Sequence, residues 1–596
     1  MNAGAGSNIA HTNAKAAGEL MDALVSLGLR RVVVCPGSRS TPLVLAADAH
    51  ARLEVELLHD ERVAAFYALG LGREDGHATA MITTSGSAVA HALPAVVEAD
   101  ASDVPLLLLS ADRPPELHDC AAPQTTRQSQ LLASHTRYAA DLGTPTPKQD
   151  MAWIATVAAR AWSAAHGAAP GPVHLNLAFR EPLWEPGAGE SGAASKLTPR
   201  ARAMRTISGR VRLTSGQLDA LAKEIDEERT LLVCGPLTGA DRPRELSAAL
   251  DTLAARRGWP LLADLATGLR HRAPNEGVQA PVVATADLIA RSLKARSVEA
   301  LAPTQVLAFG LPPTSKALGQ QLQRWNAKVI TFDAAGRTRD PRHHTSLFVN
   351  ADPSSVVQGL NERLEEIPAH ELTRAWLHAD DIAAQAAREE LKEGLWAGVV
   401  AHTLMEALPA GSLLHLASSM PIRDADAFGT EGAKALHFAV SRGVNGIDGT
   451  LSTFAGEARA HHGQAALLMG DTALLHDVGG LLAVARQARP LTIVVVNNGG
   501  GGIFSHLPIA EHGAFERCFR APHGTSIEAL CSGASIQYRA VKTRQALLPS
   551  LERALQEDTT SLVEVTLDHE TDLEHHEQAW AHVARALHAG NIGGQI

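Results

Sequence analysis

Two polar segments in the last third of the chain combine residue types that bind a hard cation. Gly470-Asp471 follows one apolar run, and Asn497-Asn498 follows the next, directly before the glycines at 499–502. If both runs are parallel strands, Asp471 and Asn498 reach the same sheet edge as oxygen ligands. Mg²⁺ prefers such oxygens and leaves positions for phosphates, and Gly500 can add a main-chain carbonyl. Alone, each segment is more often a helix cap or a tight turn, but together they favour a metal site that leaves positions for phosphates.

Basic and polar side chains also follow apolar runs elsewhere in the chain. The net charge is −11, so an anionic ligand has to be held by a few placed cations. The candidates are Ser38, Arg39, Arg113, Gln124, Lys316, Ser419, Arg423 and Arg442. A single arginine is usually solvated, whereas five basic side chains that all follow strand-like runs favour an anionic substrate.

Short apolar runs alternate with helical patterns along the whole sequence. This alternation predicts an α/β fold of three doubly wound parallel-sheet domains, over residues 1–190, 205–365 and 370–596. The segment 185–202 is rich in small residues and is expected to be a linker. Ligands in such sheets bind beyond the carboxyl ends of the strands, where the candidates lie.

Composition excludes several other classes of protein. The acidic net charge argues against nucleic acid as a ligand, and the longest apolar runs are too short to span a membrane. Five scattered cysteines without a Cys-x-x-Cys pair indicate reduced thiols, and no signal peptide is visible. We therefore expect a cytoplasmic protein.

The Gly470-Asp471 and Asn497-Asn498 pair resembles the diphosphate–magnesium motif of thiamine-diphosphate enzymes, with Thr472 where many of them have a second glycine. The resemblance implies thiamine diphosphate with Mg²⁺ (or Mn²⁺), held at Asp471, Asn498 and Gly500. It also implies an activating glutamate, for which Glu61 is the candidate. By itself Glu61 is more often an acidic first-turn residue of a helix. The other implied cofactor contacts are Ser85, Gly86, Ile447, Gly470, Thr472, Ile503 and Phe504.

The middle block resembles the domain that holds FAD in some thiamine-diphosphate enzymes. Its first turn, residues 234–240, contains only two glycines and lacks the Gly-x-Gly-x-x-Gly pattern. We therefore expect this domain to bind no dinucleotide.

A narrower resemblance comes from PGSRSTPL, TTSGSAVA, ADRPPEL, PTSK, GIDG and NNGGGGIFSHLP in this order. Together they resemble the 2-succinyl-5-enolpyruvyl-6-hydroxy-3-cyclohexene-1-carboxylate synthase family of menaquinone biosynthesis. The resemblance implies decarboxylation of 2-oxoglutarate and 1,4-addition of the succinyl-semialdehyde carbanion to isochorismate. It further implies a homodimer or homotetramer with active sites between subunits. Another thiamine-diphosphate-dependent 2-oxo-acid decarboxylase, or an acetolactate-type synthase, is the alternative.

The family resemblance also divides the candidate residues by role. Ser419 and Arg423 are expected to hold the distal carboxylate of the succinyl unit, and Ile447 to support the bent cofactor. The catalytic set it implies is Glu61, Arg39, Gln124, Lys316, Ser419, Arg423 and Arg442. One departure is Ala317, where the family often has a second basic residue.

Two further features receive ordinary interpretations. The adjacent pair His575-His576 is not expected to bind metal, because neighbouring residues on a helix point apart. The acidic run DHETDLEHHE, which contains this pair, is expected to be a solvated helix start.

Overall fold

The computed structural model describes residues 3–186, 204, 206–225, 228–241, 243–271, 280–293, 298–429, 432, 434–590 and 592. Most of the predicted linker at 185–202 lies outside these residues. The chain divides into two compact units: residues 1–209 with 448–460, and residues 210–447 with 461–596. Each unit is described by itself.

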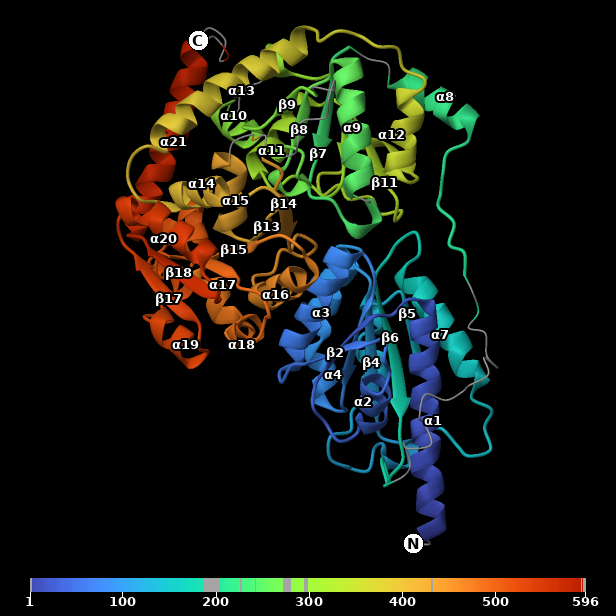
Figure 1. The fold of residues 1–596 in the computed structure, drawn as a ribbon. Coiled ribbons are helices and arrows are strands. Elements are labelled where there is room, and N and C mark those ends of the chain that lie inside the picture. Colours follow the sequence, from blue (N-terminus) through green and yellow to red (C-terminus); the bar gives the residue numbers. More distant parts are fainter. Residues whose placement is uncertain are drawn as a thin grey trace. The chain divides into compact units, whose positions relative to one another are not determined.

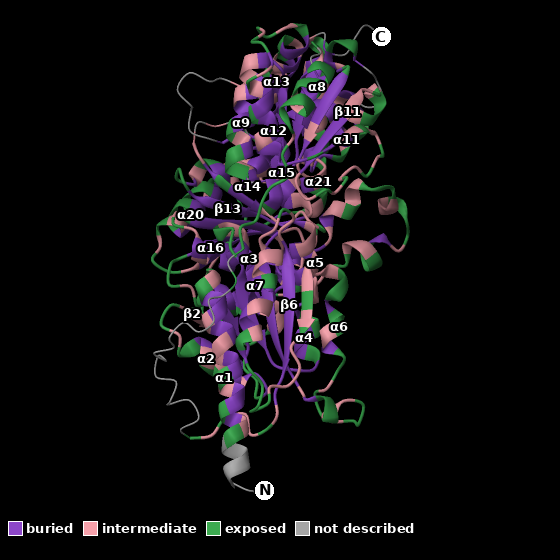
Figure 2. Ribbon diagram, turned by 90° about the vertical axis from the view of Figure 1, so that its right-hand side faces the viewer, coloured by how far each residue is buried: buried purple, intermediate pink, exposed green. Residues whose placement is uncertain are grey.

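The first unit is built on one six-stranded sheet in which every described pairing is parallel, in the order β2-β1-β3-β4-β6-β5. Its strands are β1 (Arg31–Val34), β2 (Glu54–Leu57), β3 (Thr79–Thr83), β4 (Leu106–Asp112), β5 (Tyr138–Asp141) and β6 (Pro172–Ala178). Its helices are α1 (Ala3–Leu27), α2 (Thr41–Asp48), α3 (Glu61–Asp75), α4 (Ser87–His91), α5 (Leu93–Ala101), α6 (Gln128–Leu131), α7 (Ala152–Ala165) and α16 (Thr450–Ala460). Strands β3, β4 and β6 are buried throughout, as central strands covered by helices on both faces must be (Figure 2).

Helix α16 follows the second unit's strand β14 in sequence but packs against α3 in the first unit. Glycines make this close crossing possible. A Cβ on Gly70 would lie 2.0 Å from the Thr453 carbonyl oxygen, and one on Gly456 would lie 2.1 Å from the Tyr67 carbonyl oxygen. The predicted boundary of the third domain therefore does not coincide with the boundary between the compact units, and the division into three domains stays a prediction.

The second unit contains two more parallel six-stranded sheets. The middle sheet has the order β12-β11-β10-β7-β8-β9 and the C-terminal sheet the order β14-β13-β15-β16-β18-β17. The middle strands are β7 (Thr230–Cys234), β8 (Leu261–Ala263), β9 (Val282–Val283), β10 (Gln305–Phe309), β11 (Lys328–Asp333) and β12 (Thr345–Asn350). The C-terminal strands are β13 (Leu413–Leu416), β14 (His437–Val440), β15 (Ala465–Gly470), β16 (Thr492–Asn497), β17 (Gln537–Val541) and β18 (Ser561–Thr566). The predicted α/β fold class with three parallel sheets is confirmed.

Helices cover both sheets of the second unit, and the long helices α13 and α21 run beside each other over its outside (Figure 1). Those around the middle sheet are α8 (Ser215–Glu224), α9 (Pro243–Arg257), α10 (Ala286–Leu293), α11 (Lys316–Trp325), α12 (Pro353–Asn361) and α13 (Glu371–Glu390). Those around the C-terminal sheet are α14 (Ala397–Ala407), α15 (Met420–Phe428), α17 (Asp471–His476), α18 (Gly480–Ala485), α19 (Ile527–Gly533), α20 (Arg544–Gln556) and α21 (His569–Ala589). Within the described part of the chain, none of the helices is long and apolar enough to cross a bilayer.

Each sheet has a point where the chain changes direction along the strand order. These points lie between β1 and β3, between β7 and β10, and between β13 and β15. In open parallel sheets, ligands bind beyond the strand ends at such points. Residues 35–40 and 84–86 follow the first pair of strands, and residues 417–423 and 471–472 follow the third pair. The candidates that the fold places where a ligand is expected are Ser38, Arg39, Ser85, Gly86, Ser419, Arg423, Asp471 and Thr472.

Candidate active site

At the switch point of the first unit, Arg113 joins two segments that sequence reasoning had singled out. Its guanidinium donates hydrogen bonds to Ser85 Oγ and, over 2.8 Å, to the Gln124 carbonyl oxygen. A third bond reaches Gln124 Oε1 at 3.3 Å. Burial and the charge of Arg39 both lower the pKa of Arg113, so the two arginines lie close enough to repel each other. An anion would relieve this repulsion.

Arg39 is buried and has a donor to spare. Its guanidinium donates to the Phe179 carbonyl oxygen at 2.9 Å and pairs with Glu181 at 2.8 Å. The Arg39 Nε–H is buried and has no hydrogen-bond partner among the described residues. Since Glu181 is largely exposed, solvent screens that ion pair. Arg39 can therefore turn part of its fork to a bound carboxylate.

The first residue of α3 is Glu61, directly behind the N-cap Asp60. The Asp60 carboxylate accepts the backbone N–H groups of Arg62 and Val63, at 2.8 and 3.2 Å. Because Asp60 provides the cap, the half-buried carboxyl of Glu61 is left out of the capping bonds. Burial together with the carboxylates of Glu61 and Asp60 raises the pKa of the Cys35 thiol far above its usual range, which places Glu61 near the end of β1.

Gln128, a buried residue that sequence reasoning did not identify, holds the turn at Ser85-Gly86 in place. Gln128 Oε1 accepts the Gly86 N–H at 3.1 Å, while Nε2 donates to the Ala111 carbonyl and to Asn176 Oδ1, both at 2.8 Å. Gly86 has φ +83°, a conformation that favours glycine. The turn at Ser85-Gly86 is therefore held by strands β4 and β6 through one fully buried side chain.

In the second unit, Asp471 organises the predicted diphosphate–metal segment. Its Oδ2 accepts the N–H groups of Gly499 and Gly500, both at 2.9 Å, and Oδ1 accepts from Thr472. Gly500 has φ +146°, and a Cβ there would lie 2.2 Å from the Arg520 carbonyl oxygen. The two strand ends are thus adjacent, as the spacing predicted.

Two residues beside this turn were missed by sequence reasoning. Arg520 donates to the Asn498 carbonyl oxygen at 2.9 Å, and His523 Nε2 lies 3.3 Å from Asp471 Oδ2. That buried Nε2 makes no hydrogen bond within the described residues. A carboxylate, an amide and a glycine turn with an unsatisfied donor beside them suit a divalent ion and a diphosphate. The segment RCFRAPHG carries no motif that could have revealed either residue.

The remaining site residues of this unit gather at the neighbouring strands β13 and β14. Ser419 has φ +78° and is the N-cap residue before α15, and its carbonyl oxygen accepts from the Arg423 guanidinium. Ser418 Oγ donates to the Ser441 carbonyl oxygen at 3.0 Å, which joins the two loops. Burial and the charge of Arg442 both lower the pKa of Arg423. Ser419, Arg423 and Arg442 therefore form one cationic cluster.

Helix α21 approaches this cluster with a histidine that sequence reasoning had dismissed. His576 is buried, and its Nε2 lies 2.8 Å from Asp424 Oδ1. Burial alone would lower the pKa of His576, but the carboxylate of Asp424 raises it to about 9. Asp572 is buried as well. The acidic run does begin a helix, but the expectation that it is solvated is wrong at Asp572 and His576.

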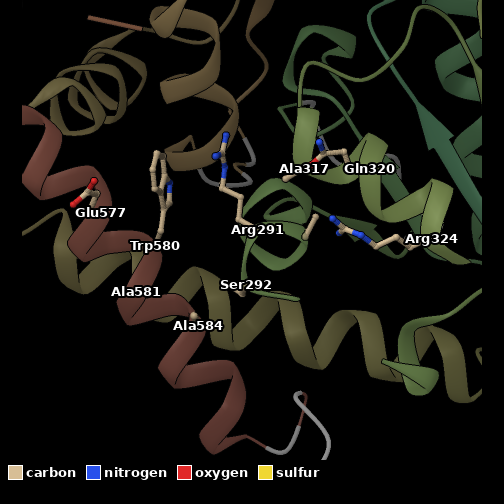
Figure 3. A pocket seen from close by; sticks show the side chains of 10 residues that line it. Arg291, Ser292, Ala317, Gln320, Arg324, Glu577, Trp580, Ala581 and Ala584 are labelled. Carbon is tan, nitrogen blue, oxygen red and sulfur yellow. The ribbon is translucent and has the colours of Figure 1, made fainter. Parts of the chain in front are cut away.

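The middle sheet contributes Lys316, an exposed residue at the start of α11. Near it lies a cavity of about 430 Å³ between α10, α11 and α21 (Figure 3). Arg291 lines the cavity, pairs with Asp287 at 2.6 Å and lies over the Trp580 ring at 4.6 Å. Ala317 lines it too. The position where the family often has a second basic residue therefore borders this cavity.

The structure thus forms three groups from the predicted residues. Arg39, Ser85, Gly86, Arg113 and Gln124 share an edge of the first unit, and the Asp471 turn and the Arg423 cluster share an edge of the C-terminal sheet. The exposed Ser38 is next to Arg39 in sequence, while the half-buried Ile447 and Ile503 and the more exposed Phe504 lie in segments beside the second unit's groups. Within the described residues, no contact of Gly470 or Lys316 marks either of them as part of a site.

Two family models match this chain. Residues 14–132 match the family described as thiamine pyrophosphate enzyme, N-terminal TPP binding domain, and residues 431–565 match the corresponding C-terminal TPP binding domain. The fold and both matches define the chain as a thiamine-pyrophosphate-dependent (thiamine-diphosphate-dependent) enzyme.

Whole-length relatives make the assignment narrower. Proteins named 2-succinyl-5-enolpyruvyl-6-hydroxy-3-cyclohexene-1-carboxylate synthase are 38% identical in Chloroflexus aurantiacus (96% of this chain, 97% of that protein) and 37% identical in Myxococcus xanthus (98% and 99%). The protein of that name in Oceanobacillus iheyensis is 34% identical (95% and 97%). The chain belongs to this synthase family.

Proposed function

We propose that the enzyme decarboxylates 2-oxoglutarate and adds the remaining four-carbon unit to isochorismate in a 1,4-addition, as a step of menaquinone biosynthesis. The observation that carries this proposal is the order of groups along one sheet edge. Arg442, Ser419, Asp471 and Asn498 follow the adjacent strands β14, β13, β15 and β16. An anchor for a carboxylate thus lies beside an anchor for a diphosphate.

The turn at Asp471 would hold the cofactor through its metal. Asp471, Asn498 and the Gly500 carbonyl offer oxygen ligands of the kind that Mg²⁺ or Mn²⁺ takes, and His523 Nε2 lies 3.3 Å from the Asp471 carboxylate. When bound, thiamine diphosphate supplies a nucleophilic carbon for the 2-oxo group and accepts the electron pair left by CO₂.

Glu61 would act as the proton partner of the cofactor's aminopyrimidine. Its carboxyl is half-buried and free of capping bonds, so it can hold a proton at one oxygen and share it with a ring nitrogen. The Ser85-Gly86 turn and Ile447 would position the ring.

The two groups of arginines would divide the substrates between them. Arg423 and Ser419 suit the distal carboxylate of 2-oxoglutarate, because the fork of Arg423 pairs bidentately with a carboxylate. Arg39, Arg113, Gln124, Lys316 and Arg442 would hold the carboxylates and the hydroxyl of isochorismate or the reacting carboxylate.

The reaction is tested by supplying the holoenzyme with 2-oxoglutarate or pyruvate, with and without isochorismate. We expect CO₂ release and loss of isochorismate with 2-oxoglutarate, and neither with pyruvate. Release of CO₂ from pyruvate alone would instead indicate another 2-oxo-acid decarboxylase or an acetolactate-type synthase.

We further propose that the enzyme is a cytoplasmic homodimer or homotetramer with active sites between subunits. Leu57 near Glu61, and Phe504 and Leu507 after the glycine turn, are apolar and exposed, as interface residues are in an isolated chain. The five unpaired cysteines suit a reducing compartment. Sedimentation of the purified holoenzyme distinguishes monomer, dimer and tetramer.

The middle domain is proposed to bind no dinucleotide. A Cβ on Gly235 would lie 1.8 Å from the Leu311 carbonyl oxygen, so the loops after β7 and β10 contact each other at the switch point. The absorbance spectrum of the purified protein tests this: a flavin band would contradict the proposal.

A further inference from the structure

Arg423 lies beside a carboxylate that could neutralise it. Its sequence neighbour Asp424 is buried in the same helix turn, and the charges of the two side chains interact. An arginine whose fork is taken by its own neighbour has less affinity for a substrate carboxylate. Because adjacent side chains on a helix point apart, Asp424 can turn to Arg423 only when it lacks another partner, so a group that pairs with Asp424 keeps the two apart.

His576 occupies the position that this requires. Its Nε2 contacts Asp424 Oδ1 at 2.8 Å, and its Nδ1 contacts the Asp572 carbonyl oxygen at 2.7 Å. A carbonyl oxygen can only accept, and an ionised carboxylate can only accept too. Both ring nitrogens must then donate, so His576 is an imidazolium that forms a buried ion pair with Asp424.

The surroundings of Arg423 explain why this pairing matters. Besides burial, the charges of Arg442 and Arg291 lower the pKa of Arg423, while those of Asp424 and Asp287 raise it, so three cations and two carboxylates share the region. Without its histidine, the buried Asp424 carboxylate would be unpaired, which is a costly state in a protein interior. The nearby arginine is the cation that would relieve it.

We propose that His576 is a positioning residue, which holds the Asp424 carboxylate in a buried ion pair and thereby leaves the Arg423 guanidinium for the substrate carboxylate. This inference rests on the proposed role of Arg423 toward 2-oxoglutarate. It assigns a part in substrate selection to the C-terminal helix, 153 residues away from Arg423 in sequence.

The test measures steady-state kinetics of the holoenzyme with both substrates. In His576→Gln the charge is lost but a donor toward Asp424 is kept, which favours folding. We expect KM for 2-oxoglutarate to rise about tenfold, the size of one lost charge-assisted hydrogen bond. The KM for isochorismate and kcat should stay near the parent values. His582→Gln is the matched control, because His582 lies on the same helix but pairs with Glu390 at 2.6 Å.

Asp424→Asn separates this role from a merely structural one. It removes the competing carboxylate, so the single variant should keep or lower KM for 2-oxoglutarate, and Asp424→Asn/His576→Gln should return KM to the parent value. If the ion pair only braces α15, both variants should instead raise KM, which would overturn the proposal. An unchanged KM for 2-oxoglutarate in His576→Gln would also overturn the proposal. If His576→Gln does not fold, the Asp424→Asn result decides alone.

Failure of the proposed function gives a different result. If the parent enzyme does not turn over 2-oxoglutarate with isochorismate, the proposed function is wrong. If the parent is active and the variants fail the pattern above, only the positioning role is wrong.

Discussion

The turn at Asp471 and the cluster at Arg423 follow adjacent strands of one sheet, but they are held in place in different ways. The turn is local: Asp471 bonds to backbone groups of residues 472, 499 and 500, all from one strand–helix–strand unit. The cluster depends on α10 and α21, which are distant in sequence. A site built from residues close in sequence can be recognised as a motif, whereas a site assembled by tertiary packing from distant elements cannot.

Asp471→Ala should have the largest effect, because it removes both a metal ligand and the acceptor of the glycine turn. We expect activity at limiting cofactor to fall about a thousandfold, since a bound metal contributes several kcal/mol. Saturating Mg²⁺ and thiamine diphosphate should restore part of it. Asp558→Ala is the control and should retain full activity, because Asp558 is exposed in the loop between α20 and β18. Full activity of Asp471→Ala at limiting cofactor would show that the turn is not the anchor.

The ion pair of His576 should appear in the pH dependence of stability. The folded-state pKa of about 9 lies above the ordinary value of 6.5. The pair therefore contributes fully below about pH 6.5, and its contribution is lost as pH rises through 9. The shift corresponds to about 3 kcal/mol. Urea unfolding between pH 6 and pH 10 should show a loss of this order that His576→Gln diminishes and His582→Gln retains. Equal slopes in all three proteins would contradict the ion pair.

Arg423→Ala should weaken 2-oxoglutarate more than isochorismate. Loss of a charged bidentate partner corresponds to about 2 kcal/mol, or roughly a 30-fold rise in KM for 2-oxoglutarate. The affinity for thiamine diphosphate, measured by fluorescence titration, should change little. Equal changes in both substrate KM values would remove the division of roles between the two regions.

Of these four predicted effects, that of Gly500→Ala on the turn at Asp471 should be the smallest. Its φ of +146° and the nearby Arg520 carbonyl oxygen leave no room for a side chain. Backbone strain of about 1.5 kcal/mol would lower cofactor affinity roughly tenfold. Gly513→Ala is the matched control, since a Cβ there would meet nothing within 4 Å. The same cofactor Kd in both variants would show that the turn tolerates a side chain.

The same contrast explains what the sequence could and could not predict. The three parallel sheets and the proximity of Asp471 to the glycine turn followed from apolar runs and from what comes after them. The sequence predicted that Arg113 and Gln124 bind substrate and that Ser85 contacts the cofactor, but it did not predict that Arg113 bonds to both of the others. Gln128, Arg520 and His523 carry no local pattern, because their partners come from other strands or loops.

The prediction that His576 lies on a solvated helix face was wrong. A run of charged residues suggested a solvated surface, but Asp572, His576, Ala579 and Val583 recur at helical spacing and are all buried. The spacing was readable from the sequence. The partner of His576 was not, since Asp424 lies 152 residues away.

We propose that Glu61 of one subunit and Asp471 of another serve the same cofactor. Glu61→Gln and Asp471→Ala chains, coexpressed with different affinity tags and purified through both, test it directly. Each variant alone should be nearly inactive, since one lacks the proton partner and the other the metal ligand. A mixed dimer should contain one intact site and regain about half of the parent activity. Mixed oligomers that stay as inactive as the two single variants would contradict the claim.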